Sequence, residues 1–467
     1  MKNLLKKPKS PVLQTLSRYE KYNLKENPFP TNPSVNKENT DSRYNGEIFE
    51  SRIRDEEFEK VKKYFLNVPQ SDPNHQRIGY ILDTSYIGRG NGKSSFCLNL
   101  LKKINKEYSL DLSNDVNKCF GIYISPEPSG RTRTFYSVLD LFFESVLNSN
   151  IINYCLATLR LQAILELYPD KEQIFEEIED EAIVVKLLND AEWYNNNSIE
   201  INKVTNKILK GDALVSIPRE FPLYKDLNNY NANFIITQQN FKDYYKSLKV
   251  GRERLEFIFT HLVNFFIGCG FNGAYVIIDD FERIPDFQSD RQKREFALEL
   301  RSNFFDGIST NAKVGFYNLI LVLHAGVQRL LEKAWSDTGM EQRSPISTIN
   351  NNANHVIYFN KLEGKDALLL VQKYLSEYRL TETNSEDYTP FTKEAILRIA
   401  ELAELNAAGI LRRASHLLDK ASEVDRDVID ELFVNEINEV VTSADSSLIQ
   451  NIKDEETTNL WDKAQQE

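Results

Sequence analysis

The residues best suited to chemistry lie in one glycine-rich run, Ile87-Gly88-Arg89-Gly90-Asn91-Gly92-Lys93-Ser94-Ser95. The glycines let the backbone turn so that its N–H groups face inward around phosphate oxygens. Lys93 would reach the terminal phosphates, and Ser94 would supply a hydroxyl to Mg²⁺, with Ser95 as the next candidate. We therefore expect the loop from Gly88 to Ser95 to bind a nucleotide through its phosphates.

This loop departs at one position from the usual pattern GxxxxGK[ST], because Ile87 stands where the pattern has glycine. We expect Gly88 to make the turn instead. A helix that begins near Lys93 would direct its positive end toward the same anion. The alternative is a glycine-rich surface turn, but a predicted strand before the loop and a predicted helix after it favour the phosphate loop.

A second candidate group follows the apolar run Val276-Ile277-Ile278, which ends in Asp279 and Asp280. An apolar strand that ends in carboxylates is the Walker B element of enzymes with a phosphate loop. Asp279 would hold Mg²⁺ directly or through water. Asp280 or Glu282 would take a proton from the attacking water, and we favour Asp280 because it directly follows the magnesium ligand.

Several other chemistries are excluded by the residues that would carry them. The five histidines form no HExxH motif and no cluster with cysteine, and no GxSxG motif is present, which argues against metal-dependent and serine hydrolases. The four cysteines are widely spaced without a CxxC pair, so a disulfide framework or zinc ribbon is not expected, and a reducing interior is the simplest location.

The elements that must position these residues alternate between short apolar runs and helical patterns. Such alternation predicts an α/β fold, a parallel sheet with crossover helices. The expected strands are 77–85, 119–125, 273–281, 318–326 and 355–362. We expect Asp279 to lie on the strand adjacent to the one that leads into the phosphate loop.

The chain is long enough for several folding units. Residues 1–60 are polar and proline-rich and predict an extended arm before a core at 61–362. Lys93 and Asp279 are 186 positions apart, which is far more than a compact core needs for one intervening strand and its helices. The extra residues fall in a helical insertion at about 150–260, which we expect to carry partner contacts. Residues 363–440 predict an all-helical lid, and 441–467 an acidic tail.

Overall charge restricts the partners. The formal net charge is −12, so any contact with DNA must come from a local basic patch. Candidates are the loop 129–133 and the group Arg291, Lys293 and Arg294. The basic start has no apolar stretch typical of a secretory signal, and the apolar run 255–271 is short and interrupted by polar residues. We expect a cytoplasmic protein without membrane association.

With these parts in order, residues 20–440 resemble the AAA+ and STAND group of P-loop ATPases, and most closely their origin-recognition and transposition-regulator types. Asn27-Pro28-Phe29 is similar to the NPF arm that precedes the core in such ATPases. The segment 49–60 resembles the helix that follows this arm and lies beside the adenine. The resemblance implies a P-loop NTPase sheet with a helical insertion and a C-terminal helical lid.

The same resemblance suggests roles for residues outside the two motifs. His324, near the end of the fourth strand, stands at the sensor 1 position, which touches the γ-phosphate or the attacking water. Arg412 matches the sensor 2 arginine of the lid, with Arg413 as the neighbouring alternative. Arg329 and Arg343 are both placed where an arginine finger would reach a neighbouring subunit, and the sequence does not choose between them.

The resemblance also implies an activity. This is the hydrolysis of ATP to ADP and phosphate with Mg²⁺, used as a switch in an oligomer that contacts other subunits through the insertion. The process would be linked to DNA, as in phage defence, transposition control or replication initiation. One alternative is a scaffold that binds ATP with little turnover inside a multiprotein complex. A small-molecule kinase is a third option, against which the lid and the two-acid strand argue.

Overall fold

The computed structural model describes residues 17–66, 76–84, 90–108, 118–211, 214, 216–224, 235–307, 309–324, 326–346, 353–382 and 387–438. Gly88 and Arg89 of the predicted loop and the predicted tail 441–467 therefore lie outside the described residues. The chain divides into two compact units, one made of Met1–Asp55, Gly88–Phe96 and Asn360–Glu467 and the other of Glu56–Ile87 and Cys97–Phe359.

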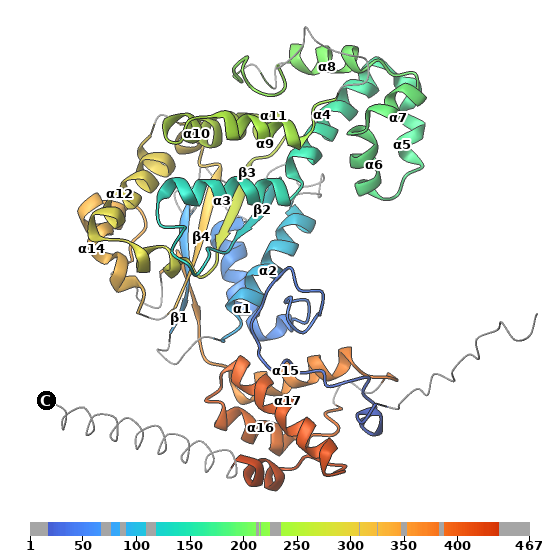
Figure 1. Cartoon of the computed structure of the whole chain (residues 1–467), viewed down its shortest axis with the longest axis vertical. Coiled ribbons are helices and arrows are strands. Elements are labelled where there is room, and N and C mark those ends of the chain that lie inside the picture. The colour runs from blue at the N-terminus through green and yellow to red at the C-terminus, as the bar shows by residue number, and fades with distance from the viewer. Residues whose placement is uncertain are drawn as a thin grey trace, which may run out of the picture. The chain divides into compact units, whose positions relative to one another are not determined.

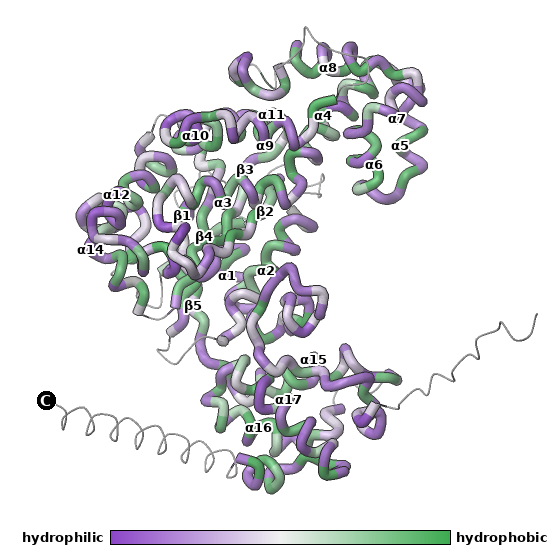
Figure 2. The backbone as a smooth tube through the Cα atoms, viewed as in Figure 1, coloured by the Kyte–Doolittle hydropathy of each residue, from purple (hydrophilic) through white to green (hydrophobic). Residues whose placement is uncertain are grey.

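The second unit is built on a five-stranded parallel sheet (Figure 1). Its strands are β1 (Ile78–Asp83), β2 (Cys119–Ile124), β3 (Gly273–Ile278), β4 (Tyr317–Leu323) and β5 (Val356–Phe359). Almost every strand residue is buried, as expected for a parallel sheet covered on both faces, and Figure 2 shows the strands as largely hydrophobic. The predicted strands and the α/β class are confirmed.

The order of the strands is β2-β3-β4-β1-β5. Ile320 of β4 pairs with Ile277 of β3 on one side and with Gly79 of β1 on the other. Our expectation that Asp279 follows the strand next to β1 is therefore wrong, because β4 lies between them. The apolar pattern of a buried strand contains no information about which strands it pairs with.

Helices flank and connect these strands. Helical turns cover most of the segments 51–66, 93–108, 135–148, 252–268 and 290–306. Before the insertion the chain forms α1 (Asp55–Val61), α2 (Lys93–Lys103) and α3 (Phe135–Asn148). Toward the end of the predicted insertion come α9 (Gln238–Ser247) and α10 (Arg252–Glu256), and after it α11 (Val263–Gly268), α12 (Asp290–Arg301), α13 (Thr310–Val314) and α14 (Gln328–Thr338).

The regular elements among the described residues of the predicted insertion are all helices. It contains α4 (Ile151–Leu167), α5 (Glu172–Glu176), α6 (Glu181–Leu188), α7 (Ala191–Asn196) and α8 (Ile201–Lys210). Trp193 and Tyr194 belong to an apolar core of its own, which is separate from the core around the sheet. The helix α4 joins the two, since Ile152 packs in the sheet core and Ile164 in the insertion core.

The other unit contains the helices of the predicted lid, α15 (Gly364–Glu377), α16 (Lys393–Leu402) and α17 (Ala407–Glu423), and we refer to this segment as the lid. The arm that precedes the sheet in sequence belongs to the same core, because Tyr22, Leu24 and Phe29 are buried among the lid side chains. The side-chain amide of Asn27 donates to the Ser415 carbonyl at 3.0 Å and, through its oxygen, accepts from the Phe29 N–H at 3.1 Å. The NPF segment is therefore a strap that fastens the arm to α17.

No helix in the described part of the chain combines the length and the apolar character that a membrane crossing needs.

Candidate functional site

The described part of the predicted phosphate loop has the backbone that such a loop needs. Gly90 and Gly92 have φ angles of 113° and 84°, in the region that favours glycine. The helix α2 begins at Lys93. Asn91 and Lys93 are buried, and Ser94 and Ser95 are half-buried on the first turn of α2. Two glycine turns that run into a helix N-terminus can hold an anion.

The first turn of the lid helix α17 packs directly on this loop. The Ala408 N–H donates to the Gly90 carbonyl at 3.0 Å, and the Asn406 side chain donates to the Asn91 side-chain oxygen at 3.2 Å. A Cβ atom at position 90 would lie 2.5 Å from the Cβ of Ala408. Gly90 is therefore required both by its φ angle and by the approach of the lid.

Arg54 is a second contact to this loop that the sequence did not reveal. It is buried, with 6% of its surface exposed, and its Nη2 donates to the carbonyls of Asn91 and Asn360, both at 3.1 Å. Asn360 lies just before the predicted lid and belongs to the same unit. Arg54 therefore connects the arm with the loop and with the residue that precedes the lid. In the sequence, only its charge and the acidic helix that follows it distinguish this residue.

In the other unit, Asp279 directly follows β3 and is held on three sides. Its N–H donates to the Ile124 carbonyl at 2.8 Å, which extends the ladder between β2 and β3 by one bond. Its carboxylate accepts from the Tyr123 hydroxyl at 2.5 Å and from the Asp280 N–H at 3.0 Å. Burial, reinforced by the Asp279 charge, raises the pKa of Tyr123 far above its usual value, so that this hydroxyl stays a donor.

Asp280 forms the turn after β3 in a conformation that is unusual for a residue with a side chain. Its φ and ψ angles are 46° and 44°, in the left-handed region, where a residue other than glycine has a cost of roughly 1 kcal/mol. Its carboxylate forms an ion pair with Arg283, whose Nη1 also donates to the Pro126 carbonyl at 2.8 Å. Residues held in such sparsely populated backbone conformations cluster at functional sites.

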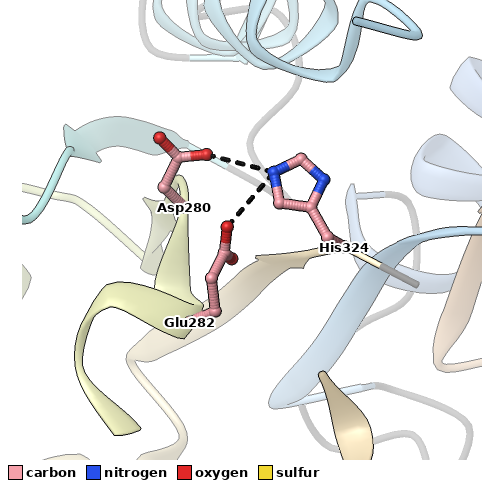
Figure 3. Close-up of side chains that lie close together, drawn as sticks. All are labelled: Asp280, Glu282 and His324. Carbon is pink, nitrogen blue, oxygen red and sulfur yellow. Dashed lines mark ion pairs between the residues drawn. The ribbon is translucent and has the colours of Figure 1, made fainter. Parts of the chain in front are cut away.

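His324 follows β4 and brings the acids of this edge together (Figure 3). Its Nε2 lies 3.1 Å from Glu282 Oε1 and 3.6 Å from Asp280 Oδ1. Its Nδ1 lies 3.2 Å from Oδ2 of Asp83, the last residue of β1. Asp83 and Glu282 are both buried. Three carboxylates thus surround one imidazole at the carboxyl ends of β1, β3 and β4.

The structure therefore brings together part of the predicted site. It places Asp280, Glu282 and His324 in one cluster, with ligand atoms within 4.8 Å of one another, so that they could also hold a cation. Asp83 and Tyr123 were missed by the sequence reasoning, although both lie in predicted strands near the same edge. The predicted metal ligands Ser94 and Asp279 belong to different units, and their joint role stays a prediction.

The predicted arginines lie in contrasting surroundings. Arg412 is exposed on α17, and its side chain has no hydrogen bond or ion pair among the described residues, whereas Arg413 donates to Asn438 at 3.0 Å. Arg329 is exposed on α14, whereas Arg343 donates to Asp306 at 2.9 Å. The roles of Arg412 as sensor 2 and of either Arg329 or Arg343 as a finger stay predictions.

Comparisons with known proteins give a distant structural likeness. No family model matches the chain, and no curated protein matches its sequence. Among solved structures, the chain is similar to the ORC2 protein of Aeropyrum pernix in its ADPNP–ADP complexes. The two are 14% identical, the match covers 82% of this chain and 67% of that chain, and the TM-score is 0.40. The ADP form of that protein gives 11% identity, 83% and 67% coverage, and a TM-score of 0.40. At this level the likeness assigns neither a family nor an activity to the chain.

Proposed function

We propose that this protein binds and hydrolyses ATP with Mg²⁺ and uses the reaction as a switch. The observation that carries the proposal is the contact between His324 and Asp83. It places the candidate catalytic acids at the carboxyl end of β1, and Gly88, the first residue of the glycine-rich loop, follows Asp83 by five positions. Ligands of parallel α/β sheets bind at the carboxyl ends of the strands.

The residues present fit a nucleotide and its metal. Gly90 and Gly92 have the positive φ angles of a backbone that can wrap a phosphate. A Cβ atom at position 92 would meet open space, so glycine is needed there for the φ angle and not for close packing. Lys93 at the start of α2 would hold the terminal phosphates, while the Ser94 hydroxyl and the Asp279 carboxylate are the hard oxygen donors that Mg²⁺ prefers. Bound Mg²⁺ would offset negative charge on the phosphates.

The cluster around His324 supplies the groups for hydrolysis. Asp280 would accept a proton from the attacking water, and Glu282 is the alternative base. His324 would contact the γ-phosphate or that water as sensor 1, and Arg412 would approach the phosphates from the lid. Both acids lie near the same imidazole, so its position affects either of them. This arrangement favours proton transfer over phosphate binding alone.

The switch would act through the lid, because α17 touches the loop that holds the phosphates. We further propose that the output is linked to DNA, in phage defence, transposition control or replication initiation, and that oligomerisation and the helical insertion supply the protein contacts. A groove of about 240 Å³ between α12 and α14 is lined by four basic residues, Arg291, Lys293, Arg294 and Lys333, and by two acids, Asp290 and Asp337, and this excess of basic groups supports contact with a nucleic-acid backbone.

A scaffold with little turnover is the second candidate. The observation that favours it is the ion pair of Asp280 with Arg283, because a carboxylate engaged by a guanidinium is a weaker base. In that case the protein would bind ATP tightly and release little phosphate. The ion pair engages Oδ2 of Asp280, so in the hydrolysing enzyme its other oxygen, Oδ1, would accept the proton.

A phosphate-release assay with and without DNA tests these alternatives. We expect Mg²⁺-dependent turnover by the wild type, stimulation by DNA, and loss of both in Lys93→Ala. The paired substitutions Lys293→Glu and Arg294→Glu should remove the stimulation but keep the basal rate. Tight ATP binding without turnover supports the scaffold, and an absence of ATP binding by the wild type contradicts both candidates.

A further inference from the structure

The side chain of Asn406 serves two partners at once. Asn406 is the N-cap of α17, and its Oδ1 accepts from the Gly409 N–H at 3.0 Å. Because an N–H group can only donate, this bond fixes which end of the amide is the oxygen. The Nδ2 atom therefore faces the loop, where it donates to Asn91 Oδ1 at 3.2 Å.

The phosphate loop in turn completes the capping of α17. The first N–H groups of a helix have no acceptor within the helix. Ala408 lies in this first turn, and its N–H donates to the Gly90 carbonyl at 3.0 Å. The side chain of Asn406 satisfies the next one, that of Gly409. The start of α17 is thus held by its own N-cap and by the loop together.

These contacts also set the direction of the loop amides. In a trans peptide the C=O of one residue and the N–H of the next point in opposite directions. The Gly90 carbonyl points at Ala408, so the Asn91 N–H is turned away from the lid helix. The Asn91 carbonyl accepts from Arg54, so the Gly92 N–H is turned away from Arg54. Two consecutive amides of the loop are therefore oriented by groups outside it.

From this geometry we infer that Asn406 is a positioning residue for the phosphate loop. It holds Asn91 so that the peptide between Gly90 and Asn91 keeps its orientation toward a bound phosphate. Docking of α17 on the loop and binding of a nucleotide then support each other, because coupling between two binding events is reciprocal. The inference rests on the proposed function, since it takes the loop to be the nucleotide site.

The Asn406→Ser variant separates the two tasks of this side chain. Serine is as good an N-cap as asparagine, so the bond to Gly409 can persist. Its hydroxyl is too short to reach Asn91, so the contact to the loop is lost. Thr392→Ala is the matched control, because Thr392 caps α16 by accepting from the Ala395 N–H at 3.1 Å and has no hydrogen bond to the loop among the described residues.

The experiment measures the dissociation constant of Mg-ADP and the thermal stability of each full-length variant. We expect Asn406→Ser to weaken nucleotide binding about tenfold, as for the loss of one hydrogen bond, with a melting temperature that falls no further than that of Thr392→Ala. Thr392→Ala should lower the melting temperature and leave the affinity unchanged. In the double variant Asn91→Ala/Asn406→Ser, the second substitution should add less than it does alone, because both act through one contact.

Three results would overturn the inference: an unchanged affinity in Asn406→Ser, an equal loss of affinity in Thr392→Ala, or full additivity in the double variant. Each of these requires that the wild type binds Mg-ADP. A wild type that does not bind contradicts the proposed function itself, so the two failures are distinguishable.

Discussion

The carboxylate of Asp83 lies 3.2 Å from Nδ1 of His324, at the point where β1 and β4 end side by side. This contact turns the other nitrogen of the imidazole toward Glu282 and Asp280. A histidine that is oriented by one carboxylate through Nδ1 presents Nε2 in a fixed direction. The acids after β3 therefore face a group whose position is set from β1.

We expect Asp83→Asn to lower ATP turnover by about ten- to a hundredfold, as is typical when a partner that orients a functional histidine is changed. The His324→Ala variant should lose at least as much, and the double variant no more than His324→Ala alone. Steady-state phosphate release measures all three, with ATP affinity measured separately. His416→Ala, at an exposed histidine of α17, is the control. Equal turnover in Asp83→Asn and the wild type would refute the orienting role.

The two candidate bases can be separated by isosteric substitution. We expect Asp280→Asn to lower turnover by at least about a hundredfold while ATP binding is kept, because general base catalysis contributes roughly that much. Glu282→Gln should retain more activity, since in our account it supports His324. Single-turnover hydrolysis distinguishes the chemical step from product release. The reverse ranking of the two variants would assign the base to Glu282.

Phe29 tests whether the arm is part of the lid. Its ring is 1% exposed and lies 6.1 Å from the ring of Tyr374 and 5.8 Å from that of Phe391. We expect Phe29→Ala to lower the free energy of unfolding of the lid by about 3–5 kcal/mol, as for other buried phenylalanines. Hydrogen exchange of α15 and α17 in urea reports this change. Phe287→Ala, whose ring is 48% exposed, should have little effect, and similar exchange in the two variants would argue against the strap.

Tyr194 gives the helical insertion a dependence on alkaline pH. Burial raises the pKa of Tyr194 to about 12, and its hydroxyl donates to the Leu188 carbonyl at 3.0 Å. Because the folded pKa lies above the unfolded value near 10, its contribution is complete below pH 10 and is lost as the pH rises toward 12. The loss over this window is about 3 kcal/mol.

The Tyr194→Phe variant removes this titration. At neutral pH we expect it to be less stable by about 1 kcal/mol, because the bond to Leu188 is gone. Its deficit should shrink and then reverse between pH 10 and 12, since phenylalanine does not ionise. Urea unfolding followed by circular dichroism at each pH measures the difference. Tyr168→Phe, at a half-buried tyrosine of the insertion, is the control, and a constant deficit across the pH range would contradict the assignment.

The sequence predicted those features that depend on the order of residues within a short segment. Buried parallel strands appear as continuous apolar runs, so all five were found, together with the acids that follow β3. Pairing between distant segments has no local signature. The position of β4 between β1 and β3, the contact of Asp83 with His324, and the packing of Phe29 under the lid each join segments that are far apart in the chain.

The site was predicted as a set of residues and not as a set of contacts. The spacing of glycines and Lys93 indicated a phosphate loop, but Arg54 and Asn406 contact it from segments on either side of the core in sequence. Likewise, the sequence presents Tyr123 as an ordinary strand residue, and only the structure shows that its hydroxyl donates to the Asp279 carboxylate. Long-range contacts of this kind depend on how the elements pack.

Equilibrium binding of Mg-ATP by the wild type and by Lys93→Ala tests the central claim most directly. The matched control is Lys102→Ala, an exposed lysine on the same helix α2. We predict that the wild type and Lys102→Ala bind with equal affinity and that Lys93→Ala binds at least about a hundredfold more weakly, as expected for the loss of a charged partner of the phosphates. No binding by the wild type, or equal binding by Lys93→Ala, would contradict the account.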